Sequence, residues 1–333
     1  MDLSRISGWQ VMARVSRATL VLFGLLVVVS TARSSDFTPH ELLDRMNEAV
    51  RKLDYEGRFV VQSAERLDAL YIVHRVSQGT EKERVVWLTG EPREIIRSDE
   101  AVACLLADRK GQIKVGLSPN GGSFSPLRGV SGSQLDASYQ MELLEPGRVA
   151  GRDSYQILIR PHDDLRYGYR LFVDQATFLP LRSVMFDETQ EVVSQVMFIE
   201  LQIGGTVPPI EHDISAMQIA RVDPQDNLMM QRLAPAQWTY PNPPPGFRLD
   251  VHRRKPVRGS SGQREHFVFS DGLARVSVYV QPAGKDGGLS GVSSLGPANA
   301  VGRLIGSHEV IAVGEVPTKT LNWFTENIVA ATP

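Results

Sequence analysis

Between residues 151 and 204 the chain shows four apolar runs separated by Pro, Gly and Asp. β-Branched and aromatic residues fill the runs, which predicts four consecutive strands joined by turns. Short connections between sequential strands favour an antiparallel meander. The predicted strands are 155–160, 166–173, 181–186 and 192–203. The last strand does not alternate cleanly, so one face is available to pack on helices and the other to line a cavity.

Residues 38–53 show the i, i+3, i+4, i+7 apolar spacing of an amphipathic helix. Thr38, Pro39 and Glu41 supply a capping box with proline at the first helical position. Strands are predicted next at 55–62, 67–76, 82–88, 93–97, 101–106 and 111–117. With the meander these make about ten strands, and a sheet of that size must curl or close. Residues 119–132 form a Gly/Ser/Pro loop, and 135–144 are predicted to be helical and to end before Pro146.

A proline-rich segment at 234–247 indicates that a second unit follows. Its predicted strands are 247–255, 266–269, 274–281, 301–304 and 309–314, with a flexible segment at 282–296 and a closing helix at 317–328. The predicted organisation is therefore a signal peptide (1–32), an N-terminal domain (33–215), a linker (216–240) and a C-terminal domain (241–333). The fold class is α+β.

The N-terminus has the pattern of a secretory signal peptide. Arg5, Arg14 and Arg17 precede a run of about a dozen apolar residues, and Ser30 and Ala32 follow it. The run is shorter than the roughly 20 residues that a spanning helix needs. A retained N-terminal anchor is the alternative. The sequence thus predicts an exported protein.

Composition and motifs argue for a binding protein. A net charge of −2 excludes an electrostatic case for nucleic acid. Cys104, the single cysteine, cannot form an internal disulfide, and we interpret it as a buried thiol. No two histidines stand three or four residues apart, and no G-x-S-x-G, P-loop or G-x-G-x-x-G motif occurs. We therefore predict no catalytic residue, metal site or cofactor. We interpret His74 as a buried, hydrogen-bonded histidine, and His162 with its two following aspartates as a polar turn.

Several segments resemble the RseB/MucB family of sigma-E factor regulatory proteins. The matching stretches are YEGRFVV at 55–61, PREIIR at 92–97, LPLRS at 179–183, PGF at 245–247, SDGLARVSV at 270–278 and GEVP at 314–317. Isolated matches are His74-Arg75, Glu83-Arg84, Leu88, Gly90, Cys104, Asp108, Tyr169-Arg170-Leu171 and Thr320. The resemblance spans essentially the whole predicted mature chain. The closing helix departs from the family by carrying Trp323 and Phe324 where smaller residues are common.

The resemblance implies a fold and a function. The N-terminal domain is expected to be a large, curved antiparallel half-barrel sheet with helices, like the lipoprotein carriers. The C-terminal domain is expected to be a smaller antiparallel sheet with a helix. The family is periplasmic and binds the periplasmic segment of the membrane-bound anti-sigma factor (RseA or MucA type). That binding shields the anti-sigma factor from proteolysis, and lipopolysaccharide or another acylated molecule in an apolar cavity releases it.

Three groups of residues are candidates for these roles. For the ligand cavity, with core packing as the alternative, they are Phe59, Val61, Tyr71, Val73, Leu171, Val173, Met185, Met197, Ile199 and Leu201. Arg93 and Arg97 fall on one side of a strand and suit a phosphate or carboxylate, with ion pairing to Glu81, Glu83 or Glu94 as the alternative. A basic run suits an acidic partner segment, with a solvated surface as the alternative: Arg248, Arg253, Arg254 and Lys255.

The leading hypothesis is a non-enzymatic, periplasmic negative regulator of an envelope-stress sigma factor. A periplasmic lipid or lipoprotein carrier is the alternative, and the second domain discriminates between them because a carrier does not need it. A hydrolase whose site is assembled from distant residues is a third hypothesis. The sequence leaves the ligand's identity and a homo-oligomeric state open.

Overall fold

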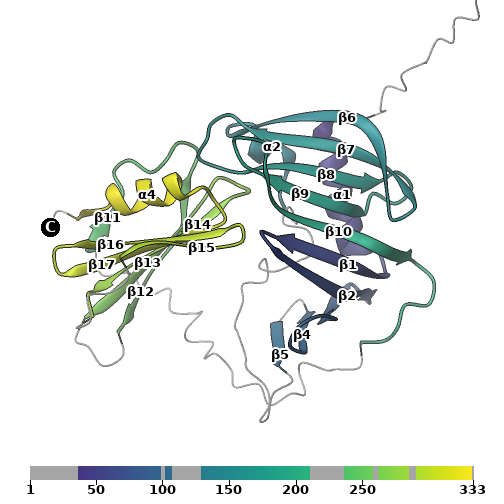
Figure 1. Cartoon of the computed structure of the whole chain (residues 1–333), viewed down its shortest axis with the longest axis horizontal. Coiled ribbons are helices and arrows are strands. Elements are labelled where there is room, and N and C mark those ends of the chain that lie inside the picture. The colour runs from purple at the N-terminus through teal and green to yellow at the C-terminus, as the bar shows by residue number, and fades with distance from the viewer. Residues whose placement is uncertain are drawn as a thin grey trace, which may run out of the picture. The chain divides into compact units, whose positions relative to one another are not determined.

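The computed structural model describes residues 37–98, 102–106, 129–210, 236–257, 262–284 and 290–331. The predicted signal peptide, most of the predicted linker and the predicted strand at 111–117 lie outside these ranges, as does most of the 119–132 loop. The side chains of residues 102–106, including Cys104, are also outside the description. Two large antiparallel sheets, each packed with a helix, form most of the described chain (Figure 1).

The larger sheet has ten strands in the order β5-β4-β3-β2-β1-β10-β9-β8-β7-β6. Their bounds are β1 Tyr55–Ser63, β2 Arg66–Ser77, β3 Thr80–Trp87, β4 Arg93–Ser98, β5 Val102–Leu106, β6 Tyr139–Val149, β7 Arg152–Pro161, β8 Gly168–Asp174, β9 Pro180–Phe186 and β10 Val192–Ile203. The predicted meander is confirmed, because β7, β8, β9 and β10 are consecutive neighbours. The sheet is open, with β5 at one edge and β6 at the other.

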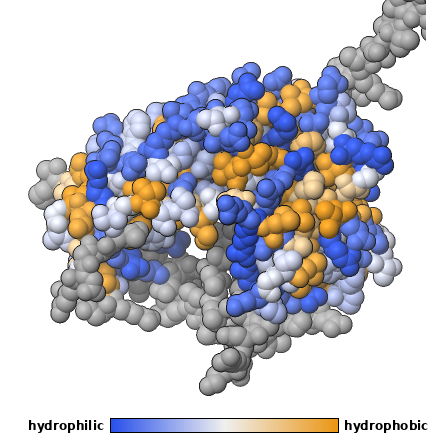
Figure 2. Space-filling view, viewed as in Figure 1, coloured by the Kyte–Doolittle hydropathy of each residue, from blue (hydrophilic) through white to orange (hydrophobic). Residues whose placement is uncertain are grey.

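Helix α1 (Pro39–Lys52) has the predicted capping box, in which Thr38 and Glu41 each accept a hydrogen bond from the other's backbone N–H. Its buried stripe packs on one face of the large sheet, which we call the α1 face. Leu42, Leu43 and Met46 contact the cluster that holds Leu171, and Val50 contacts the cluster that holds Phe59. In Figure 1 the helix lies behind the strands, so Figure 2 displays the opposite, outer face, where hydrophobic patches lie among hydrophilic residues.

The predicted helix at 135–144 is wrong. A single helical turn, α2 (Gly132–Leu135), is followed by strand β6. Tyr139, Met141 and Leu143 recur at every second position and all pack into the cluster under α1. Pro146 is accommodated at a register shift between Leu144 and Gly147, where β6 and β7 lose their regular pairing.

The smaller sheet has six strands in the order β12-β13-β14-β17-β16-β15. Their bounds are β12 Arg248–Pro256, β13 Gln263–Ser270, β14 Arg275–Pro282, β15 Gly291–Leu295, β16 Ala298–Ile305 and β17 His308–Gly314. Helix α4 (Thr318–Glu326) packs on this sheet. A two-stranded ladder joins β11 (Trp238–Thr239) to β18 (Val329–Ala330). Sequence reasoning missed β11, β15 and β18, which are short or fully exposed.

Gly57 is required where β1 meets β10. A Cβ at this position would lie 2.4 Å from the backbone oxygen of Glu200 and 3.0 Å from a ring carbon of Phe198. We expect Gly57→Ala to destabilise the protein by about 1–3 kcal/mol through overpacking. Urea unfolding should show a lower midpoint at unchanged slope. Gly284→Ala is the matched control, because nothing lies within 4 Å of its added Cβ; equal losses in the two variants would contradict the steric explanation.

Candidate functional site

The ten predicted cavity residues divide between the two faces of the large sheet. Five pack toward α1, in the clusters under the helix: Phe59, Val61, Leu171, Val173 and Met185. Strand alternation places Tyr71 and Val73 on the outer face, because Leu70 and Ile72 belong to the α1 side.

The remaining three lie in β10, where a register shift opposite Arg58 and Phe59 disturbs the alternation. Met197 packs with Phe172 and Val184, Leu201 contacts clusters on both sides, and Ile199 is 53% exposed. One cavity on the α1 face can therefore be lined by at most six of the ten residues.

A groove of about 460 Å³ lies at the rim of the α1 face. We call it the Trp87 groove. Val61, Leu70 and Trp87 provide apolar walls, and the guanidinium of Arg93 lies 3.7 Å from the centre of the Trp87 ring. The β1–β2 turn and the β15–β16 turn complete it, the latter with Leu295, which is 81% exposed. The groove thus combines apolar surface with the Arg93 cation held against an aromatic ring, and the charged side chains of Glu65, Arg66 and Asp68 also line it.

The two arginines predicted to bind one anion do not converge. Both lie on the α1 face, but they are four positions apart along the strand, which is roughly 13 Å. Arg97 is buried, with its guanidinium 3.6 Å from Glu83, whereas Arg93 lies in the Trp87 groove. Burial raises the pKa of the Glu83 carboxyl, and the charge of Arg97 offsets only part of this rise. Arg97 therefore has the ion-pair role that the alternative interpretation gave it.

The histidine and turn interpretations are confirmed. His74 is fully buried, its Nδ1 lies 2.8 Å from the carbonyl oxygen of Leu53, and its ring stacks on Tyr55. His162 lies in the turn between β7 and β8, where Asp163 accepts a hydrogen bond from the backbone of Leu165.

On the outer face, Tyr71 donates a hydrogen bond to Glu56. Burial, together with this bond, raises the pKa of Tyr71 to about 12.

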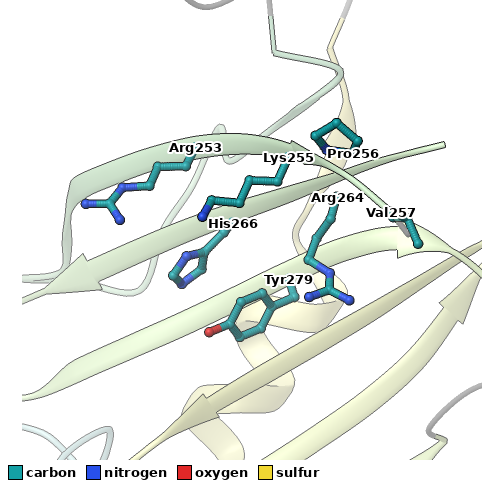
Figure 3. Close-up of a pocket in the computed structure, with 7 residues that line it drawn as sticks. All are labelled: Arg253, Lys255, Pro256, Val257, Arg264, His266 and Tyr279. Carbon is teal, nitrogen blue, oxygen red and sulfur yellow. The ribbon is translucent and has the colours of Figure 1, made fainter. Parts of the chain in front are cut away.

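A second cavity, of about 480 Å³, lies on the smaller sheet. We call it the basic pocket. Figure 3 shows its seven lining residues, which come from β12, β13, β14 and the residue after β12: Arg253, Lys255, Pro256, Val257, Arg264, His266 and Tyr279. The registers bring Arg253, His266 and Tyr279 into one row across three strands, and Lys255 opposite Arg264. No acidic side chain is among the described residues that line it.

Strand alternation divides the predicted basic run. Arg253 and Lys255 line the basic pocket, whereas Arg254 points to the other face with His252. There the carboxylate of Glu265 lies 2.8 Å from His252 and 3.5 Å from Arg254. Arg248 is exposed at the start of β12 and does not line the pocket. Two of the four predicted residues therefore share a site, joined by Arg264, His266 and Tyr279, which sequence reasoning missed.

The cations of the basic pocket contribute to lowering the pKa of His266. Its ring stacks on Tyr279 with centroids 4.3 Å apart. Burial, followed by the charges of Arg253, Arg264 and Lys255, lowers the pKa of His266 to about 4. The imidazole is thus neutral near pH 7, mainly because burial disfavours its charged form, and the cations around it act in the same direction.

A buried polar cluster joins residues of the two sheets within the compact unit Phe37–Pro333. Arg166 Nε lies 3.0 Å from Asp271 Oδ2, and Tyr139 donates a hydrogen bond to the same oxygen. Arg166 also donates to the carbonyl of Pro245. Asp271 lies within the SDGLARVSV stretch, but the sequence contained no sign of its partners.

The described residues contain no group of three or more His, Cys, Asp or Glu side chains placed to hold a metal ion. Among the same residues, no helix is long and apolar enough to cross a membrane. The described chain is thus built on two main antiparallel sheets, with a partly apolar groove at the rim of the larger sheet and a basic pocket on the smaller one.

The chain belongs to the MucB/RseB family. The model of the MucB/RseB N-terminal domain matches residues 38–224, and that of the MucB/RseB C-terminal domain matches residues 232–329. The sigma factor AlgU regulatory protein MucB of Pseudomonas aeruginosa is 31% identical over 90% of this chain and 93% of its own. The sigma-E factor regulatory protein RseB of Haemophilus influenzae is 23% identical over 91% of this chain and 95% of its own.

The fold also matches a solved complex. The structure of Pseudomonas aeruginosa MucA/MucB aligns with a TM-score of 0.68 and 26% identity, and covers 89% of this chain and 99% of that chain. Both sheets therefore have counterparts in a relative whose structure was solved in complex with MucA. The family resemblance drawn from the sequence is confirmed.

Proposed function

We propose that this protein is a periplasmic, non-enzymatic negative regulator of an envelope-stress sigma factor. It binds the periplasmic segment of a membrane-bound anti-sigma factor of the RseA/MucA type and shields that segment from regulated proteolysis. The observation that carries the proposal is the match of both domains, over 89% of the chain, to a MucB that was solved with MucA. The relatives' names as sigma-factor regulatory proteins support it.

The Trp87 groove is our candidate for the site of the releasing ligand. Its apolar walls suit an acyl chain, and Arg93 suits a phosphate or carboxylate at the head of that chain. Lipopolysaccharide and acylated lipoprotein fragments both have this chemistry. A pure lipid or lipoprotein carrier has less support, because it leaves the six-stranded second sheet without a role.

Protection from proteolysis tests the regulatory function. The anti-sigma periplasmic segment from the same genome is incubated with the first protease of the cascade, with and without the mature protein. Protection is expected from the intact protein, and adding lipopolysaccharide is expected to remove it. Cleavage at an unchanged rate in the presence of the protein would overturn the proposal.

Two variants test the ligand site. Trp87→Ala and Arg93→Gln are expected to keep the protection and to require more lipopolysaccharide to lose it, because they alter the groove. Arg58→Gln on the outer face is the control, since it also changes an exposed arginine beside an aromatic ring, that of Tyr71. If all three variants respond to lipopolysaccharide like the wild type, the ligand binds elsewhere.

A further inference from the structure

The basic pocket contains a row of three polar side chains that crosses the smaller sheet. Arg253 on β12 is paired with His266 on β13, and His266 is paired with Tyr279 on β14. Residues that are directly paired point to the same face of a sheet, so the three side chains lie next to one another. Figure 3 shows the guanidinium, the imidazole and the phenol hydroxyl at the same end of the pocket.

The middle member of this row has an unmet hydrogen bond. The Nε2 atom of His266 is buried and has no hydrogen-bond partner among the described residues. The stacking of its ring on Tyr279 fixes the position of that nitrogen. A buried polar atom without a partner is destabilising, and a ligand beside it would remove that cost. Arg253 is exposed, so its side chain is able to move and admit the ligand.

The charge of the pocket is positive at both of its ends. None of the described ion pairs contains Arg253 or Arg264, and the Nε of Arg264 donates to the neutral amide of Gln281 at 2.6 Å. Gln281 in turn donates to Glu309, which does not line the pocket. Lys255 also lines the pocket, but it makes another interaction, and we assign it no part in binding. The attraction for an anion therefore comes from the two arginines.

The number of donors in the row distinguishes a phosphate from a carboxylate. A guanidinium binds a carboxylate through two parallel hydrogen bonds, which use both of its oxygens in one plane. The donors of His266 and Tyr279 would then compete for oxygens that are already bound. A phosphate group has at least three oxygens in a tetrahedral arrangement, so it is able to accept from the guanidinium, the imidazole and the phenol at once.

The size and the far end of the pocket indicate that the phosphate belongs to a larger molecule. The volume of about 480 Å³ lies in the range of small-molecule sites. Pro256 and Val257 line the end away from the row, as Figure 3 shows. A phosphate bound at the row would thus leave apolar surface and space for the group that carries it.

We infer that the row of Arg253, His266 and Tyr279 binds a phosphate group, carried by a small organic molecule or by a lipid headgroup. The guanidinium supplies the charge, while Nε2–H of the imidazole and the phenol hydroxyl donate to the remaining oxygens. The rest of the ligand lies toward Pro256 and Val257. This site is on the smaller sheet, apart from the Trp87 groove, and does not depend on the binding of an anti-sigma segment.

Calorimetric titration of the mature protein with inorganic phosphate and with glycerol 3-phosphate tests the site. The ionic strength is held constant with chloride. We expect saturable binding to the wild type, weakened about tenfold or more in Arg253→Gln and about three- to tenfold in Tyr279→Phe. Arg248→Gln is the matched control, because it removes the same charge from β12 but lies five positions, or roughly 16 Å, from Arg253. Its affinity should change less than about twofold, since solvent and salt screen charges at that distance.

The titration of His266 gives a readout inside the pocket. Burial, followed by the charges of Arg253, Arg264, Lys255 and His252, lowers the pKa of this imidazole to about 4. A bound phosphate favours the charged imidazole, so nuclear magnetic resonance should show a higher pKa in phosphate than in chloride. In Arg253→Gln the two salts should give the same pKa, because the variant no longer holds the anion.

Further probes assign the source of the phosphate. Phosphatidylcholine vesicles are compared with and without phosphatidic acid. Retention on the phosphatidic acid vesicles that is lost in Arg253→Gln would assign a lipid headgroup. Binding of glycerol 3-phosphate without such retention would assign a soluble phosphoester, and both results support the site.

Three results would overturn the inference. Equal losses of affinity in Arg253→Gln and Arg248→Gln would mean that phosphate associates with the overall charge of the sheet. A His266 titration that phosphate leaves unchanged would place any bound anion outside the row. Tighter binding of succinate than of glycerol 3-phosphate, with the same dependence on Arg253, would assign the pocket to carboxylates instead.

Discussion

Replacing Arg166 with methionine is expected to destabilise the folded protein by about 3–5 kcal/mol, because it leaves the Asp271 carboxylate buried without its cation. The side chains of Arg166 and Asp271 are 2% and 0% exposed. Asp271 also accepts hydrogen bonds from Tyr139 and from the backbone of Leu273 and Ala274, which hold it in place. The free energy of unfolding, measured by urea titration, is the test.

The pH dependence of this variant follows from the state of Asp271. Burial raises the pKa of this carboxyl above its ordinary value, although the backbone hydrogen bonds and Arg166 act in the other direction. A group whose pKa is raised by folding contributes stability below its unfolded pKa and loses that contribution as the pH rises through its folded pKa. Removing Arg166 raises this pKa further. The deficit of Arg166→Met should therefore be largest near pH 7 and should shrink toward pH 4.

The double variant Arg166→Met/Asp271→Asn is the control. It removes both charges, so it should recover much of the stability that the single variant loses, since replacing a buried pair costs far less than breaking it. A double variant as unstable as the single one would show that packing around Phe247 and Tyr139, rather than charge, explains the loss.

Local pattern was sufficient to predict most of the strands. The run at 192–203 was predicted with the bounds that β10 has, and the capping box of α1 follows from Thr38 and Glu41 alone. Interactions within one element, or between neighbours joined by a short turn, depend on residues that are close in sequence. The segment at 135–144 was predicted wrongly because its apolar residues, among them Leu135, Tyr139 and Leu143, fit both a helical and an alternating pattern, and tertiary packing under α1 decides for the strand.

The sites were less predictable, because they depend on register. The basic run looked like one surface in the sequence, but alternation sends Arg254 to Glu265 and Arg253 to the basic pocket. Similarly, Arg93 and Arg97 share a face, yet the pairing of β3 with β4 brings Arg97 to Glu83. Trp87 follows Val85 by two residues, so strand alternation alone was enough to predict that the two side chains lie on the same face of the sheet. The buried contact of Arg166 with Asp271 had no local signal, since it joins segments far apart in the chain.

The second large effect is expected at Phe324. Phe324→Ala should destabilise the second domain by about 3–5 kcal/mol, because a fully buried aromatic side chain leaves a cavity when it is truncated. The ring lies at the centre of an aromatic cluster, with centroids 4.7 Å from Phe269, 5.6 Å from Phe247 and 5.8 Å from Tyr240. This cluster attaches α4 to the smaller sheet.

Trp323→Ala is the matched control, since it removes the neighbouring aromatic residue from the same helix. Trp323 is half-buried, and its indole N–H donates to the carbonyl of Asn242 at 3.2 Å. Losing such a bond costs about 1 kcal/mol, well below the cavity cost at Phe324. Urea unfolding followed by near-ultraviolet circular dichroism should show the larger shift for Phe324→Ala. Equal shifts in the two variants would mean that the contacts of Trp323 stabilise helix α4 as much as the buried contacts of Phe324 do. That result would contradict the role of the aromatic cluster in attaching the helix to the sheet.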